Sequence, residues 1–164
     1  MTDNTGGPSG VQPAGQAEHP RIGILAQYVK DLSFENPNAP ESLSFGGEPP
    51  QISITVDVRA QGRGEQRYEV AIKLSAEAKQ KDKIAFVAEL EYAGLFALTN
   101  FNPEQVETAC LIECPRHLFP FARRILADIS RDGGFPPLML EPIDFADLFR
   151  SKRQRPSSAP PPAG

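Results

Sequence analysis

Four stretches of this 164-residue chain alternate between apolar and polar residues with a period of two. Such alternation is typical of β-strands that bury one face and expose the other. The links at 60–66 and 76–82 are far too short for helical crossovers, so neighbouring strands must run antiparallel. The sequence therefore predicts one four-stranded antiparallel sheet, made of the stretches 27–35, 51–59, 67–75 and 83–98.

The segment between the first two strands has a different composition. From Phe34 to Pro50 it contains four prolines, which remove backbone donors and bias the preceding residues towards extended geometry. It is too long for a hairpin and too rich in proline for a helix. We therefore expect a long crossover loop after the first strand, and this loop carries the apolar residues Leu43 and Phe45.

After the fourth strand the apolar period becomes that of an α-helix. The helical stretch opens with Asn102 as a cap before Pro103, ends at the glycines 133–134, and is expected to be divided at Pro115 and Pro120. Its second part places six apolar residues along one side, namely Leu118, Phe121, Ala122, Ile125, Leu126 and Ile129. This pattern predicts an amphipathic helix that covers the sheet or a neighbouring subunit.

A short last helix is expected after Asp144, with Phe145 and Phe149 on one stripe. The fold class is therefore α+β, with helices packed on one side of the sheet. The flanks 1–20 and 151–164 are poor in large apolar groups, and we expect both to be disordered around one domain at 21–150. The second flank includes a basic cluster that we interpret as a solubilising tail, Lys152, Arg153 and Arg155.

The charge balance limits the classes of partner. The chain has 17 basic and 21 acidic residues, and residues 21–150 alone have 14 against 19, a net charge of -5. An acidic body disfavours nucleic acid and anionic membranes and favours basic partners. Since we find neither a long apolar run nor a signal-peptide pattern, we expect a cytoplasmic protein that does not insert into membranes.

The sequence offers little support for catalysis. It lacks a glycine-rich phosphate loop, and a metal site drawn from Cys110, Cys114 and His117 would be interrupted by Pro115 and lack a fourth ligand. We therefore interpret the cysteines as small packing residues and expect no enzyme, metal or cofactor. The carboxylates Glu89 and Glu91 are better explained by a solvated acidic sheet surface than by an acid and base pair.

Eight apolar residues lie on or next to the irregular segments: Phe34, Leu43, Phe45, Phe135, Leu138, Leu140, Phe145 and Phe149. One interpretation is that they cap the core beneath the loops. The other is that they line a hydrophobic groove left open for another chain. The residues by themselves slightly favour the first.

Four blocks of the sequence, in their order and spacing, resemble the SecB family of bacterial protein-export chaperones. They are "YVKDLSFENPNAP", "AFVAELEYAGLFAL", "CPRHLFPFARRIL" and "GFPPLMLEPIDFADLF", and the likeness covers about residues 22 to 150. The resemblance implies a homotetramer built as a dimer of dimers. It also implies ATP-independent binding of unfolded preproteins, which are kept export-competent and passed to the translocase motor SecA.

The resemblance also implies roles for individual residues. The SecA-docking positions of the family fall on Asp31, Glu35, Val87 and Glu89, and the subunit contacts fall on Ala88, Leu90 and Tyr92. The loop after Phe34 would form one wall of a client groove and would face Phe145 and Phe149. Without the resemblance, the alternative is an adaptor module with a closed core and an acidic docking face.

Overall fold

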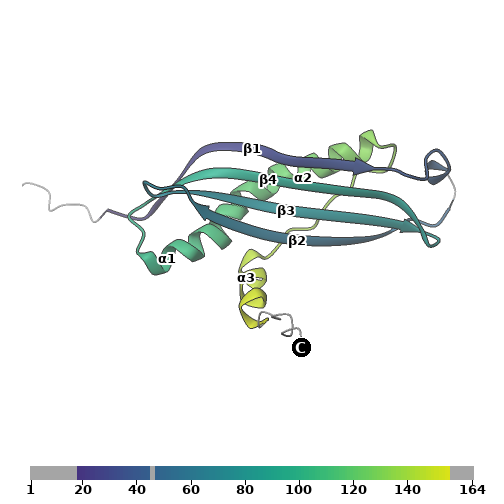
Figure 1. Cartoon of the computed structure of the whole chain (residues 1–164). Helices are drawn as coiled ribbons and strands as arrows, with labels where there is room; N and C mark the ends of the chain where they lie inside the picture. Colours follow the sequence, from purple (N-terminus) through teal and green to yellow (C-terminus); the bar gives the residue numbers. More distant parts are fainter. Residues whose placement is uncertain (1–17, 45–46, 156–164) are drawn as a thin grey trace, which may run out of the picture.

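A computed structural model describes residues 18–44 and 47–155 of the chain. The four alternating stretches form four antiparallel strands in the order β1-β4-β3-β2 (Figure 1). The strands are β1 at Arg21–Glu35, β2 at Gln51–Gly62, β3 at Arg67–Gln80 and β4 at Lys83–Thr99. The predicted four-stranded antiparallel sheet is confirmed.

The chain between β1 and β2 passes from one edge of the sheet to the other, because these two strands are the edge strands. Its described part contains only a short 3-10 turn, η1 at Glu41–Leu43, and a cis peptide bond between Ala39 and Pro40. The expected crossover loop is therefore present. Its predicted groove residue Phe45 lies outside the described residues.

All four strands are longer than the alternation predicted, β1 and β3 by the most. β1 begins at Arg21, and β3 continues to Gln80 through Ala76 and Ala78, which are completely buried. These alanines continue the alternating pattern, but their small side chains make the apolar signal weak. The turn into β4 is correspondingly tight and consists of Lys81 and Asp82, both with positive φ.

The helical stretch is continuous through both prolines, so the expected division at Pro115 and Pro120 is wrong. It consists of α1 at Pro103–Thr108, the π-helical segment η2 at Ala109–Glu113 and α2 at Cys114–Asp132. In the π segment the Cys114 N–H bonds to the Ala109 carbonyl, five residues back. Pro115 then falls in the first turn of α2, where a missing N–H is tolerated.

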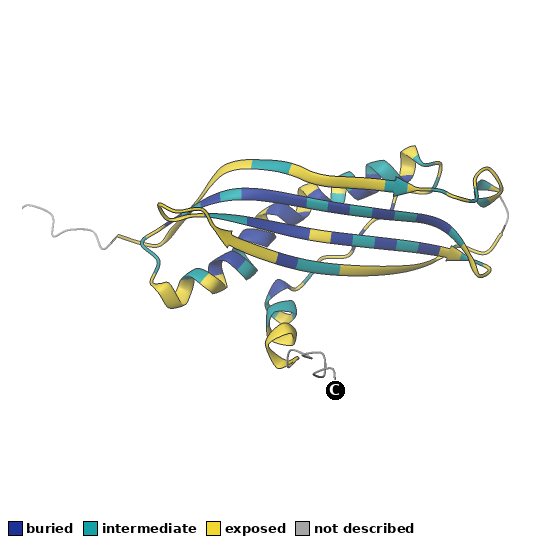
Figure 2. Ribbon diagram, in the orientation of Figure 1, coloured by how far each residue is buried: buried dark blue, intermediate teal, exposed yellow. Residues whose placement is uncertain are grey.

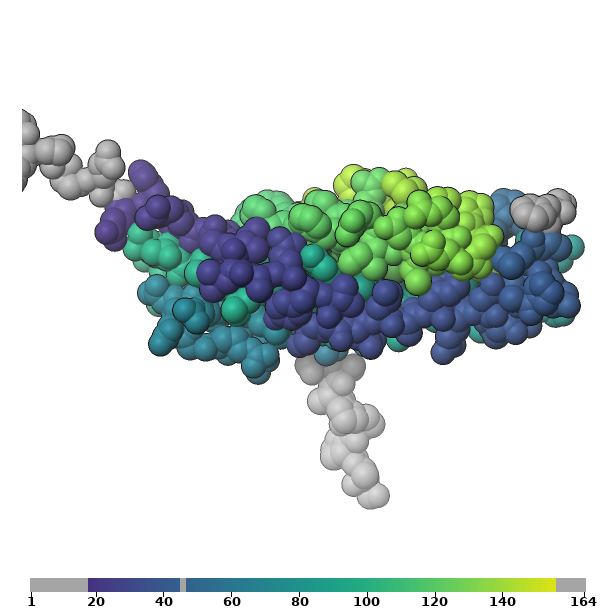
Figure 3. All heavy atoms as spheres, turned by 90° about the horizontal axis from the view of Figure 1, so that it is seen from above, coloured from purple at the N-terminus to yellow at the C-terminus, as the bar shows by residue number. Residues whose placement is uncertain are grey.

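Helix α2 forms a second layer on one face of the sheet, against β4 and β3 (Figures 2 and 3). Leu118, Ala122 and Leu126 are fully buried there. Phe121 was predicted on the same buried side, but its side chain is 44% exposed. Below α2, helix α3 at Phe145–Gln154 begins at Asp144, whose carboxylate accepts a hydrogen bond from the Asp147 N–H at 3.0 Å.

Helix α3 extends through residues 151–154, beyond the end predicted at 150. Lys152 bonds to Asp57 and to the Val58 carbonyl of β2, and Arg153 pairs with Glu107 at 2.8 Å. These two basic residues therefore belong to the folded body and not to a solubilising tail. Within residues 18–44 and 47–155, no helix is both long and apolar enough to cross a membrane.

Candidate binding surfaces

The face of the sheet turned away from α2, here called the open face, carries the residues predicted to dock SecA. Strand pairing places Glu35 beside Val87 on the neighbouring strand and Asp31 beside Glu91, with Glu89 between these two pairs. Within the part of the chain that the structure describes, none of these four carboxylates forms an ion pair. We call this set of residues the acidic surface.

A compact polar network occupies another part of the open face. Glu69 of β3 accepts hydrogen bonds from the Tyr28 hydroxyl at 2.5 Å, from Lys30 at 2.9 Å and from Arg63 at 3.2 Å. The bond from Tyr28 and then that from Lys30 lower the pKa of Glu69 to about 2. Burial, followed by the bond to Glu69, raises the pKa of Tyr28 to about 12. Glu69 is therefore ionised and strongly held at neutral pH.

Three of the predicted groove residues meet at the end of α2 below the crossover loop. The rings of Phe34 and Phe135 lie 6.4 Å apart, and both pack on Phe86, at 5.4 Å and 4.9 Å. Leu43 from the loop packs so closely over Gly134 that a β-carbon there would lie 2.9 Å from the leucine. These residues form one hydrophobic cluster that ties the loop to the helix.

The linker after α2 is fixed to the helix by one buried hydroxyl. Ser130 is fully buried, and its Oγ accepts a hydrogen bond from the Leu138 N–H at 2.8 Å while donating to the Leu126 carbonyl at 2.8 Å. Leu138 and Leu140 are in turn 8% and 3% exposed. Within this chain, therefore, these two predicted groove residues belong to the core.

The two phenylalanines of α3 have different environments. Phe145 is 1% exposed and meets Phe119 of α2 edge-on, with ring centroids 5.9 Å apart. Phe149 is only half-buried, and the Arg153 guanidinium lies 4.8 Å from its ring centroid. The crossover loop lies at one end of the sheet and α3 near its middle (Figure 1), so the expected facing walls are not found within one chain.

Some apolar side chains that the sequence did not single out as binding residues remain exposed on the helix side. Ile52 and Ile54 were predicted to face inward and do lie on that side, but they are 43% and 41% exposed, and Met139 in the linker is 60% exposed. We call Ile52 and Ile54 the β2 strip. A helix about 10 Å wide covers about two strands spaced about 4.8 Å apart. A count of four strands against one long helix could therefore have predicted an uncovered edge.

The predicted subunit contacts Ala88, Leu90 and Tyr92 lie on the helix side of β4, with exposures of 1%, 0% and 8%. They are packed within the chain, and Tyr92 stacks on the exposed Phe121 at 6.3 Å. The neighbouring edge strand β1 exposes its own apolar residues, namely Ile24, Leu25, Val29 and Leu32. Phe121 and the β1 edge are thus more accessible than the residues originally predicted.

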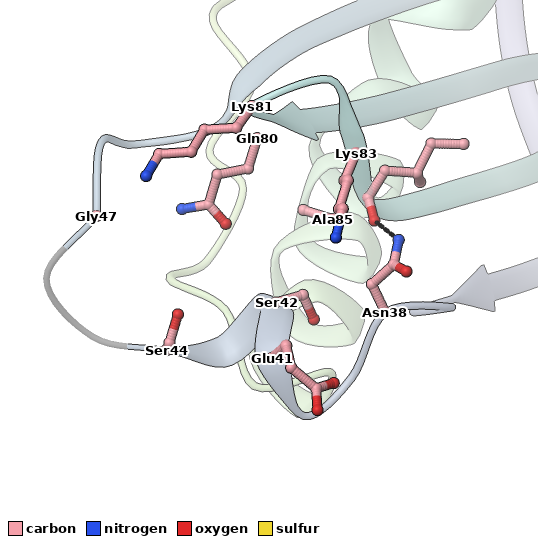
Figure 4. Close-up of a pocket in the computed structure, with 10 residues that line it drawn as sticks. Asn38, Glu41, Ser42, Ser44, Gly47, Gln80, Lys81, Lys83 and Ala85 are labelled. Carbon is pink, nitrogen blue, oxygen red and sulfur yellow. Dashed lines mark hydrogen bonds between the residues drawn. The ribbon is translucent and has the colours of Figure 1, made fainter.

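A cleft of about 400 Å³ separates the crossover loop from the β3–β4 turn (Figure 4). Seven of its ten lining residues are polar or charged, and the Asn38 side chain spans it by donating to the Ile84 carbonyl at 2.8 Å. Lys81 and Lys83 are among the residues that line it (Figure 4). This lining does not suit an apolar client, so we do not assign the groove to this cleft.

The cysteines lie where the packing interpretation placed them. Cys110 and Cys114 are unpaired and buried, at 2% and 0% exposure, whereas His117 is exposed. A hydrogen bond donated to Cys110, followed by burial, raises the pKa of the Cys114 thiol. Within residues 18–44 and 47–155, these three side chains do not form a group that could hold a metal ion.

These surfaces define the class of protein. The molecule is a small α+β binding protein with a covered core, an uncovered apolar strip beside that core, and an acidic open face. Figure 2 shows that exposed residues run along both edge strands while the two central strands are largely buried.

The chain belongs to the SecB family. Residues 15–156 match the family described as "Preprotein translocase subunit SecB". A protein-export protein SecB of Parvibaculum lavamentivorans is 53% identical over 149 residues, covering 91% of this chain and 89% of that one. Its counterpart in Bradyrhizobium diazoefficiens is 48% identical over 164 residues, covering 100% and 99%. The resemblance found in the sequence is confirmed.

A solved structure shares the fold. It is the SecB-like chaperone Rv1957 of Mycobacterium tuberculosis, in complex with a ChAD peptide from the HigA1 antitoxin Rv1956. The TM-score is 0.62 at 16% sequence identity, and the match covers 75% of this chain and 91% of that one. At this identity the likeness supports the fold of the sheet and helices.

Proposed function

We propose that this chain is an ATP-independent holdase of the cytoplasm, which binds unfolded preproteins, keeps them competent for translocation and delivers them to SecA. The observation that carries the proposal is the β2 strip, because it leaves apolar side chains exposed beside an otherwise closed core. Burying one large apolar side chain of a client contributes about 1.5 to 3 kcal/mol. A single strip therefore binds weakly, and it selects chains whose apolar groups are not already buried.

Tight holding requires several linked strips, so we propose that the chain acts as a homotetramer, a dimer of dimers. Linked sites raise the effective concentration of each later contact along one long client. The open edge of β1 supports this assembly, since unpaired strand edges with exposed apolar residues favour association. The predicted contacts, Ala88, Leu90 and Tyr92, would support the interface from the neighbouring strand β4. Tyr92 would do so through Phe121, on which it stacks.

The client site we propose is the β2 strip together with the partly exposed members of the predicted groove, Phe34, Leu43, Phe135 and Phe149. Leu138, Leu140 and Phe145 would support this site from the core. The acidic surface, with Asp31, Glu35, Val87 and Glu89, would dock SecA on the other face of the sheet. Client and SecA could then be bound together, and release would follow from coupling between the two sites.

Light scattering tests the holdase directly. We expect the purified protein to have the mass of a tetramer and to gain mass when mixed with an unfolded preprotein but not with its folded form. A monomer that binds neither the unfolded nor the folded preprotein would exclude a holdase. It would favour the adaptor module with a closed core, which the burial of Leu138, Leu140 and Phe145 supports. Binding of an apolar dye in the native state would distinguish an open strip from a sealed core.

An Ile54→Asp substitution is expected to weaken client binding about tenfold or more, because a charge replaces an apolar contact within the β2 strip. The matched control is Thr55→Asp, which adds the same charge one residue along, on the open face. Titration of a labelled unfolded preprotein measures both variants. Equal affinities for the two would place the client site elsewhere.

A Glu89→Lys substitution is expected to weaken SecA binding about tenfold while client binding stays unchanged, because it reverses a charge at the centre of the acidic surface. Glu18→Lys makes the same change at an exposed position outside the sheet and should have little effect. Surface plasmon resonance with SecA, alongside the client titration, measures this separation. Loss of both activities in a variant that is still a tetramer would contradict it.

A further inference from the structure

Lys30 is next to Asp31 in the sequence, yet its charge is directed away from the acidic surface. The register of β1 shifts between Val29 and Asp31, which gives Lys30 no partner residue on β4. Its Nζ atom instead lies 2.9 Å from Glu69 on β3, two strands away. A lysine in this bulge could otherwise turn its ammonium group towards the carboxylates beside it.

Glu69 is well suited to hold this charge. Its side chain is only 13% exposed, and its two oxygens receive donors from Tyr28, Lys30 and Arg63. Ala71 and Ala93 lie on the same open face but are 6% and 0% exposed, as expected if these long side chains extend over them. Because the Glu69 carboxylate binds both Lys30 and Arg63, neither cation is directed towards the rest of the open face.

The acidic surface has few other cations near it. Lys79 is already paired with Glu77 at 3.2 Å, which leaves Lys73 opposite Glu91 on β3. The orientation of the Lys30 side chain therefore determines how negative the acidic surface is. Charges that lie on opposed surfaces govern both the rate and the selectivity of docking.

We propose that Glu69 is a positioning residue for the acidic surface: by holding Lys30 and Arg63, it keeps Asp31 and Glu91 free to meet a basic partner. The inference rests on the proposed docking of SecA at this surface. It assigns to the network a role in recognition as well as in the packing of the sheet.

The test begins with Glu69→Gln in the full-length protein. Release of Lys30 towards Asp31 or Glu91 should weaken SecA binding about two- to fivefold, the size expected of one surface ion pair. Lys30→Gln/Glu69→Gln should restore the affinity, because the released cation is then absent. Glu65→Gln is the charge control: it removes one carboxylate from the exposed β2–β3 turn and should leave the affinity within twofold of wild type.

A crystal structure of the Glu69→Gln variant provides a readout that does not depend on SecA. The expected result is a Lys30 ammonium group within 4 Å of the Asp31 or Glu91 carboxylate. A Lys30 side chain that points into solvent would overturn the proposal, and so would equal weakening by Glu69→Gln and Glu65→Gln. Failure of the double variant to recover would also overturn it, since a structural defect is not repaired by removing Lys30.

The two proposals can fail separately. A wild-type protein that does not bind SecA would remove the proposed docking, and with it the recognition role assigned to Glu69. A wild-type protein that binds SecA while Lys30 keeps its direction in the Glu69→Gln variant would retain the docking and overturn the positioning role alone.

Discussion

Replacing Phe145 with alanine is expected to lower the free energy of unfolding by about 3 to 5 kcal/mol, the usual cost of removing a buried phenylalanine ring. The side chain is 1% exposed and packs edge-on against Phe119. Its loss would leave a cavity between α2 and the start of α3 and would also remove the aromatic pair. Urea unfolding at a fixed protein concentration, followed by circular dichroism, measures the change.

The matched control lies four residues further along α3. Phe149 is half-buried, with the Arg153 guanidinium over its ring, so Phe149→Ala should cost less than about 1 kcal/mol. If the two variants were destabilised equally, Phe145 would not be part of the core. This comparison also matters for client binding, because weaker holding by a Phe145 variant would first have to be separated from partial unfolding.

Gly133→Ala is expected to destabilise the protein by about 1 to 3 kcal/mol, although alanine has the higher intrinsic helix propensity. The backbone φ of -73° suits alanine, so the cost is steric. A β-carbon would lie 2.3 Å from two atoms of the Phe34 ring. The ring cannot easily withdraw, since Phe86 and Phe135 pack against it.

Gly62→Ala is the control for this prediction, because the nearest atom to its new β-carbon would be 3.9 Å away, an ordinary contact. Thermal unfolding of the two variants side by side should show a lower midpoint for Gly133→Ala alone. An unchanged midpoint would mean that the crossover loop can move away from α2. The hydrophobic cluster of Phe34 and Leu43 would then be looser than its distances indicate.

The sheet could be predicted because alternation is a local property of the chain. A strand with one buried face must repeat every second residue, and the short links 60–66 and 76–82 allow only antiparallel neighbours. The prolines were misjudged for a related reason. Their local effect is real, but the π segment before Pro115 shifts the hydrogen bonds by one residue and removes the conflict there, whereas Pro120 lies inside α2 without ending it.

The two candidate sites differ in the same way, because only one of them follows from local periodicity. Residues of the acidic surface could be placed on one face from the strand period alone, and strand pairing then brought Glu35 beside Val87. The groove could not be derived in this way, because a leucine or phenylalanine in an irregular segment has no period that shows which way it points. Packing buried Leu140 and Phe145 and left Ile52 and Met139 exposed.

What the sequence determined by itself, then, is the sheet, its polar face, the family and the position of the crossover loop, all of which follow from local periodicity and matching blocks. Only the tertiary structure decided which apolar side chains remain exposed and where Lys30 directs its charge. Both depend on contacts between distant segments: α2 is too narrow to cover four strands, and Glu69 holds a lysine from two strands away.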